Sequence, residues 1–118
     1  MTAASVDPRL FATLVPINGL GADRQRQLAA QIRVEQWPSG QVLFEEGSHD
    51  NLSFYVLAGE VALASKKTGT NRVVLGGSDE ANYPLANLKP RQFSGTAKTP
   101  VRVLTVDSEL LDKLLTWD

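Results

Sequence analysis

Hydrophobic residues recur at helical spacing near both ends of the chain and in short alternating runs between them. The segment "DPRLFATLVP" predicts a short helix with Asp7 as its N-cap and Pro8 at its first position, ended by Pro16. A second helix is predicted over residues 22–34, and a third begins at Ser108, which can act as an N-cap. The apolar stripes expected to be buried on these helices are Leu10, Phe11, Leu14, Val15, Leu28, Ala29, Ile32, Leu110, Leu111, Leu114 and Leu115.

Between the helices the period becomes that of strands. The runs "VEQW", "QVLFEE", "LSFYVLAG", "EVALAS", "RVVLGG" and "VRVLTVD" are separated by Gly, Ser, Asn, Asp or Pro, the spacing typical of a sandwich or barrel. Because no helix intervenes, the sheets should be antiparallel. In the last run Val101 and Val103 should share one face and Leu104 and Val106 the other. The residues expected to line the sheets include Phe44, Phe54, Val56 and Val61.

Gly59 separates two apolar runs in "LAGEVAL". We therefore expect it to adopt a backbone conformation that other residues avoid. Together, these patterns predict a mainly β fold with flanking helices, an antiparallel double-stranded β-helix or jelly roll.

Composition is that of one ordinary globular domain. The chain has 118 residues, 42% of them hydrophobic and 21% charged, enough to close a single core. Cysteine is absent, which removes disulfides and thiolate sites and fits a reducing compartment. Asp7 and Arg9 lie where a signal peptide would need apolar residues, and the apolar runs are too short to span a bilayer. We expect a cytoplasmic protein with no direct membrane contact.

The net charge of −1 conceals an uneven distribution. Two acids lie between residues 61 and 106, whereas the basic residues there are Lys66, Lys67, Arg72, Lys89, Arg91, Lys98 and Arg102. A basic block is the footprint of nucleic acid or of a smaller anion, but interleaved aromatic residues and a helix-turn-helix pattern are both missing. Solvated strand faces explain most of these charges, and nucleic acid is not expected as a direct partner.

The stretch "GQVLFEEGSHDNLSFYVLAGEVAL" resembles the first half of a cyclic-nucleotide-binding domain. The positions that fit the family pattern are Gly40, Gly47, Phe54, Tyr55, Leu57, Gly59, Glu60 and Val61. The resemblance covers about residues 8–116 and implies short helices, an eight-stranded jelly roll and a closing helix. It divides the single domain, 1–118, into N-terminal helices (7–34), a β-roll (35–107) and a C-terminal helix (108–117). Since the chain stops at "LLTWD", where the family's lid helix would begin, we expect a piece of a longer chain, with an output domain fused or separate.

The resemblance also implies a ligand-binding cassette. In the family this cassette consists of Phe-Gly-Glu, a short helix and then an arginine. The glutamate accepts a hydrogen bond from the ribose 2′-hydroxyl. The arginine and the backbone N–H groups at the start of the helix hold the cyclic phosphate. Counting back from "VLTVD" places Arg91 on the arginine and "EAN" on Phe-Gly-Glu. The candidate ligand-binding residues are therefore Arg91, Asn82, Glu80, Ala81, Gln92 and Ser94, with cyclic AMP, cyclic GMP or another small anion as ligand.

This sequence departs from the cassette in three ways. Asn82 replaces the glutamate, Pro84 removes an N–H at the start of the presumed helix "PLANL", and Phe93 puts a ring where the family has alanine. Arg91 is then either an anion-gripping group or a structural residue that caps loop carbonyls or pairs with Glu80. The missing glutamate favours the structural interpretation.

Catalytic and metal-binding patterns are lacking. His49 is the one histidine, which argues against the metal site of the cupins that share the jelly roll and leaves cupin catalysis a distant third hypothesis. Ser94 and Ser108 have no nearby histidine, and no Gly-x-Ser-x-Gly elbow is present. We expect no catalytic residues, no metal and no resident cofactor. The sequence predicts a non-enzymatic regulatory module whose cyclic-nucleotide binding is weak or lost; the alternative is a working cyclic-nucleotide sensor with a divergent pocket.

Overall fold

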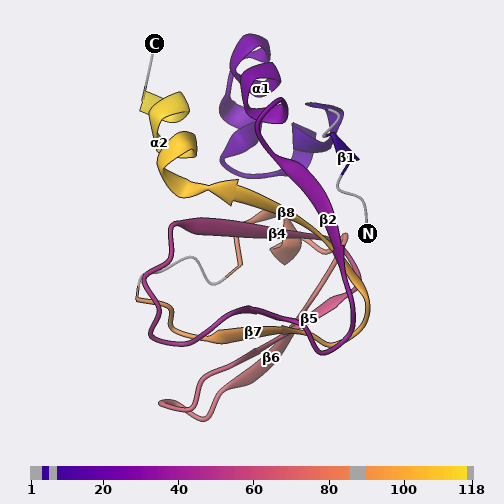
Figure 1. The fold of residues 1–118 in the computed structure, drawn as a ribbon, viewed down its shortest axis with the longest axis vertical. Helices are drawn as coiled ribbons and strands as arrows, with labels where there is room; N and C mark the ends of the chain where they lie inside the picture. Colours follow the sequence, from indigo (N-terminus) through magenta and orange to yellow (C-terminus); the bar gives the residue numbers. More distant parts are fainter. Residues whose placement is uncertain (1–3, 6–7, 86–89, 117–118) are drawn as a thin grey trace.

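Two antiparallel four-stranded sheets face each other, and helices cover the outer side of one of them (Figure 1). This computed structural model describes residues 4–5, 8–85 and 90–116. Sheet A has the order β1-β2-β8-β4 and sheet B the order β3-β7-β5-β6. The mainly β, two-sheet prediction is therefore confirmed.

The elements have the following bounds. The strands of sheet A are β1 (Ala4–Ser5), β2 (Arg33–Trp37), β8 (Val101–Asp107) and β4 (Leu52–Ala58). Those of sheet B are β3 (Val42–Phe44), β7 (Ser94–Ala97), β5 (Glu60–Ala64) and β6 (Asn71–Leu75). The α-helices are α1 (Ala22–Ala29) and α2 (Ser108–Thr116), and the 3-10 helices are η1 (Pro8–Thr13), η2 (Ile17–Gly19) and η3 (Glu80–Asn82).

Sheet A is buried on both faces, so its strands carry apolar residues on both sides. In β8, Val101 and Val103 face the space between the sheets, whereas Leu104 and Val106 face the helices, as the alternation predicts. Two apolar clusters result. The inner cluster, between the sheets, contains Leu43, Phe44, Phe54, Val56, Val61, Leu63, Val74, Ala81, Leu85, Ala97, Val101 and Val103. The outer cluster contains Phe11, Leu14, Ile17, Leu20, Leu28, Ala29, Ile32, Val34, Tyr55, Leu104, Val106, Leu111 and Leu114.

The helices differ in detail from the sequence pattern. The first is a 3-10 helix, and its Leu10 is exposed rather than buried. Leu115 of α2 is likewise exposed. The N-cap of α2 is Asp107, whose Oδ1 accepts from the N–H of Glu109 at 2.8 Å. Ser108, the predicted cap, is instead hydrogen-bonded through Oγ to Ser53 Oγ at 2.9 Å.

Some predicted features lie outside the described residues: the N-cap Asp7 and residues 86–88 of the presumed helix "PLANL". Two strands were not predicted. β1 has only two residues, and β7 has the sequence "SGTA", whose small residues give no alternating apolar signal. β7 is nevertheless central, because it pairs with both β3 and β5.

Gly59, between β4 and β5, has the expected left-handed backbone, with φ of +88°. A Cβ there would also lie 2.4 Å from the carbonyl oxygen of Pro100. Two constraints therefore exclude a side chain at this turn, a positive φ and a close backbone approach.

Three glycine substitutions separate these constraints. Gly19→Ala should leave the free energy of unfolding nearly unchanged, because Gly19 has open space around it and no positive φ. Gly47→Ala, with φ of +88° but open space, should cost about 1–2 kcal/mol. Gly59→Ala should cost more than about 3 kcal/mol, because backbone must move as well. Urea unfolding of the three variants measures the series, and equal losses at Gly47 and Gly59 would contradict it.

Candidate functional site

Arg91, the arginine on which the sequence analysis centres, lies buried just before β7. Its side chain has no exposed surface. The guanidinium is bidentate to Asp50 in the loop between β3 and β4, with Nη2 2.7 Å from Oδ1 and Nε 3.1 Å from Oδ2. This fork-to-carboxylate geometry is the strongest kind of side-chain ion pair.

The remaining contacts of Arg91 are also internal. Nη1 donates to the carbonyl of Leu85 at 3.2 Å, and Nη2 donates to the carbonyl of Leu52 at 2.6 Å. The guanidinium carbon lies 4.2 Å from the ring centroid of Phe44 and 5.6 Å from that of Phe54. Arg91 thus joins the β3–β4 loop, the start of β4 and the segment after η3.

Gly95 in β7 makes room for this arrangement. It pairs with Phe44 across the β3–β7 ladder, and a Cβ at Gly95 would lie 2.6 Å from Cζ of the Phe44 ring. The ring therefore lies over a backbone that has no side chain, and the guanidinium of Arg91 packs on the ring.

The three residues aligned with the cassette's Phe-Gly-Glu form η3 and have three different surroundings. Glu80 is exposed and ion-paired with Arg72 of β6. Ala81 is 2% exposed and belongs to the inner cluster. The backbone carbonyl of Asn82 accepts from the N–H of Val15 at 2.7 Å, and Asn82 lines a groove that Leu10 and Leu14 of the N-terminal segment also line.

Glu80 was given above as one structural partner for Arg91, and that pairing is wrong. Arg91 pairs with Asp50 and Glu80 with Arg72. The loop carbonyls, the other structural partners considered, do accept from Arg91.

The other candidate residues lie around the start of β7. Gln92 is exposed. Phe93 is partly buried against the inner cluster. Ser94 Oγ accepts from the backbone N–H of Glu46 at 2.9 Å. Neither the packing of Phe93 nor the contact between Ser94 and Glu46 was evident from the sequence, because each depends on which segments lie opposite β7.

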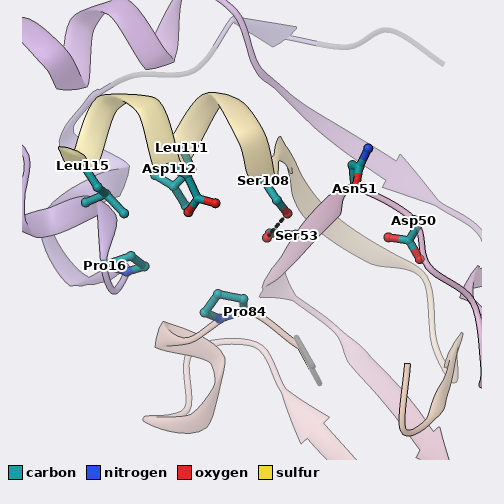
Figure 2. Close-up of a pocket in the computed structure, with 9 residues that line it drawn as sticks. All are labelled: Pro16, Asp50, Asn51, Ser53, Pro84, Ser108, Leu111, Asp112 and Leu115. Atoms are coloured by element: carbon teal, nitrogen blue, oxygen red, sulfur yellow. Dashed lines mark hydrogen bonds between the residues drawn. The ribbon is translucent and has the colours of Figure 1, made fainter. Parts of the chain in front are cut away.

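Two small cavities flank the segment after η3. One of about 210 Å³ lies against sheet B, with Leu63, Arg72 and Glu80 among its lining residues. The other, of about 230 Å³, lies under α2 between Leu115, Asp112 and Pro84 (Figure 2). Asp50, the partner of Arg91, lines this second cavity.

Titratable groups near the site have structural contacts. The Tyr55 hydroxyl donates to the carbonyl of Val15 at 2.9 Å, and burial raises the pKa of Tyr55. The backbone N–H of Lys66, 2.9 Å from the Glu46 carboxylate, is the largest cause of a lowered pKa at Glu46. His49 is exposed in its loop. In the part of the chain that the structure describes, no three His, Asp or Glu side chains gather where they would bind a metal.

Asp50 is a site residue that the sequence analysis did not predict. It lies beside His49 in "GSHDN", and the sequence carries no signal that a loop acid and an arginine 41 positions away meet. None of the described helices has the length and hydropathy needed to cross a bilayer.

Comparison with solved structures places this architecture among known folds. A cyclic nucleotide-binding-like protein from Brucella abortus is similar with a TM-score of 0.70 and 19% identity, covering 94% of this chain and 98% of that one. The sensor domain of the transcriptional regulator DNR from Pseudomonas aeruginosa has a TM-score of 0.76 and 13% identity, covering 92% and 80%.

A third similar structure is a regulatory subunit of a cAMP-independent protein kinase A from Trypanosoma brucei, a triple mutant bound to cAMP. Its TM-score is 0.68 at 17% identity, over 91% of this chain and 41% of that one. At these identities the likeness is one of fold.

Sequence comparison identifies the family. Among curated proteins no sequence matches this chain. The family model described as "Cyclic nucleotide-binding domain" matches residues 34–117, well over half of the chain and all of the strands from β3 to β8. The glycine-spaced resemblance is thereby confirmed. This chain belongs to the cyclic nucleotide-binding domain family.

Proposed function

We propose that this domain is a non-catalytic regulatory module in which binding of cyclic nucleotides at the cassette is weak or lost. The observation that carries the proposal is the buried Arg91, whose side chain is bonded to Asp50 and to two backbone carbonyls. In this proposal the domain acts through contacts with a partner protein or a fused domain, and not by converting a substrate.

A cyclic phosphate that approached Arg91 would find the guanidinium donors already bonded to Asp50 and to two backbone carbonyls. It would have to displace the carboxylate of Asp50 or bind beside it, and two anions close together repel each other. Displacement removes the cationic partner of a partly buried carboxylate, which would keep only its hydrogen bonds from neutral groups such as Ser48 Oγ and the Leu52 N–H, and this cost opposes ligand binding. The family's glutamate contributes to binding at the ribose, and here that position is Asn82.

The packing of Phe93 also supports weak binding. Among the cavities lined by candidate residues, the one beside Glu80 is about 210 Å³ and the one beside Ser94 is about 490 Å³, against roughly 300–1,000 Å³ for most ligand pockets. The ring of Phe93 packs against the inner cluster, where the family's alanine would leave space. The trypanosome protein to which this chain is similar is described as a regulatory subunit of a cAMP-independent kinase and was bound to cAMP as a triple mutant.

The alternative is a working sensor of cyclic AMP or cyclic GMP. The observation in its favour is that Arg91 is retained and that its forked donors are ordered by Asp50 and by the rings below it. A preorganised arginine loses little entropy on binding, provided that the phosphate reaches it.

Calorimetric titration separates the two functions. We expect no saturable heat when micromolar cyclic AMP or cyclic GMP is added to the natural chain. The triple variant Ala81→Gly, Asn82→Glu, Phe93→Ala should gain measurable affinity, because it supplies the ribose acceptor and removes a ring. A single hydrogen bond to a charged group accounts for about ten- to a hundredfold of that gain.

The control for this gain is Gln27→Ala, an exposed glutamine of α1 away from the cassette, which should leave the affinity of the triple variant unchanged. Arg91→Lys in the triple variant keeps the charge but removes the forked donors, and should abolish the gain while far-ultraviolet circular dichroism shows an intact fold. Tight binding by the natural chain that Arg91→Lys removes would establish the sensor instead.

A double-mutant cycle tests the structural role of Arg91. Arg91→Met should lower the free energy of unfolding by about 3 kcal/mol, because the Asp50 carboxylate loses its partner. In the double variant with Asp50→Asn part of that loss should return, since no unpaired charge remains. The matched control is Arg102→Met, an exposed arginine of β8, which should change stability by less than about 0.5 kcal/mol. Strictly additive effects at Arg91 and Asp50 would refute the coupling.

A further inference from the structure

A strand at the edge of a sheet carries N–H and C=O groups that have no partner strand, and proteins usually cover, shorten or bend such edges. The two sheets have four edge strands: β1 and β4 in sheet A, β3 and β6 in sheet B. Three of them follow this rule, and β6 does not.

β1 is only two residues long, and β3 has three residues with an irregular register between Val42 and Phe44. β4 is long but covered. The carbonyl of Phe54 accepts from the N–H of Leu85 at 2.8 Å, and that of Leu52 accepts from Arg91.

β6 is five residues long, has no proline, and keeps a regular register with β5; its one charged residue, Arg72, is ion-paired with Glu80. Two hydrogen bonds at the ends of the ladder define which groups face β5: the N–H of Ser65 donates to the carbonyl of Thr70 at 2.9 Å, and the N–H of Gly76 donates to the carbonyl of Gly59 at 2.8 Å. Hydrogen-bonded pairs alternate along an antiparallel ladder. The backbone groups of the even-numbered residues of β6 are therefore hydrogen-bonded to β5. The backbone N–H and C=O groups of its odd-numbered residues point to the open edge of the sheet.

Those odd-numbered residues are Asn71, Val73 and Leu75. The carbonyl of Leu75 accepts from the N–H of Ser78 at 3.1 Å. Within residues 4–5, 8–85 and 90–116, no other residue bonds to the outward backbone groups of Asn71 or Val73. Their side chains are uncharged and lie on the outer face of sheet B, with Val73 37% and Leu75 50% exposed. In Figure 1, β6 lies at the end of the molecule opposite α1.

We propose that β6 is a self-association surface, and that its occupant is the β6 strand of a second copy of this chain, antiparallel and related by a two-fold axis at Val73. The outward N–H groups of Asn71, Val73 and Leu75 and the outward carbonyls of Asn71 and Val73 then meet the same strand of the other copy, with Val73 opposite Val73 and Asn71 opposite Leu75, while the Leu75 carbonyl keeps its bonds from Ser78. Sheet B becomes one continuous eight-stranded sheet.

Charge supports a second copy over an unrelated strand. The hairpin tip before β6 carries the exposed Lys66 and Lys67, and the segment after β6 carries the exposed Asp79, whereas the neighbouring Glu80 is ion-paired with Arg72 of its own chain. Antiparallel pairing brings the basic tip of each copy beside the acidic segment of the other, twice by symmetry. An unrelated peptide would have to supply both charges at the right ends.

The contact is small. Pairing two five-residue edges buries less than the roughly 1,200 Å² typical of stable complexes, so the dimer should form only as protein concentration rises. The cavity of about 210 Å³ beside Glu80 is lined by Arg72 and Val74 of β6 and therefore borders this edge. The strand contact itself needs no nucleotide, so it is tested in the absence of nucleotide.

Sedimentation equilibrium of the full chain, over a wide range of protein concentration and without cyclic nucleotide, measures the proposed dimerisation. We expect reversible dimers for the natural chain and for Val73→Thr, which keeps shape and N–H. Val73→Pro removes only an N–H that points to the open edge, and it should stay monomeric. Thermal unfolding checks that this variant remains folded.

Charge exchange gives a second test that does not rely on proline. Lys67→Glu or Asp79→Lys alone should weaken dimerisation about tenfold, and the two together should restore it. A monomer at every concentration, or a dimer unaffected by both Val73→Pro and the single charge changes, would overturn the proposal. Binding of an unrelated strand-forming peptide without dimerisation would overturn it as well.

Discussion

The burial of sheet A on both faces is the constraint on which the rest of the domain depends. β4 and β8 must carry apolar residues on two sides, because the helices lie against one face and sheet B against the other. Tyr55 and Leu104 belong to the outer cluster, while Phe54 and Val103 belong to the inner one. A one-residue shift in register would exchange these sets and leave both clusters without their largest members. Strict alternation in the central strands is therefore what fixes the position of the helices relative to the roll.

Within this scaffold Arg91 has a structural role that involves no ligand. Arg91 is long enough to reach from the start of β7 across the inner cluster to the β3–β4 loop, and its charge is matched there by Asp50. A buried pair of this kind makes a loop conformation specific as much as it adds stability. The resemblance assigns Arg91 to the arginine that contacts phosphate in the nucleotide-binding family, and on that assignment Asp50 and a bound phosphate would compete for the same guanidinium donors.

The sequence predicted more of the fold than of the site. Alternation in "VRVLTVD" and the glycine at position 59 report local geometry, and both were interpreted correctly. β7 was missed because "SGTA" has no side chain large enough to mark a face. Asp50 was missed for a different reason: a loop acid acquires its partner only when distant segments meet. Asn82 likewise could be assigned to a position in the cassette but not to the groove beside the N-terminal segment.

The close packing of the Phe44 ring on Gly95 links positions that are otherwise treated separately. Because a methyl group there would collide with the Phe44 ring, and because that ring supports the guanidinium of Arg91, the glycine, the ring, the arginine and Asp50 form one interdependent set. Substitutions at these four positions should have non-additive effects. Whether a change at one position is tolerated depends on the residues at the other three. Over evolutionary time such positions should change together or not at all. A cassette arginine in a related chain is therefore comparable with Arg91 only when position 95 is also known.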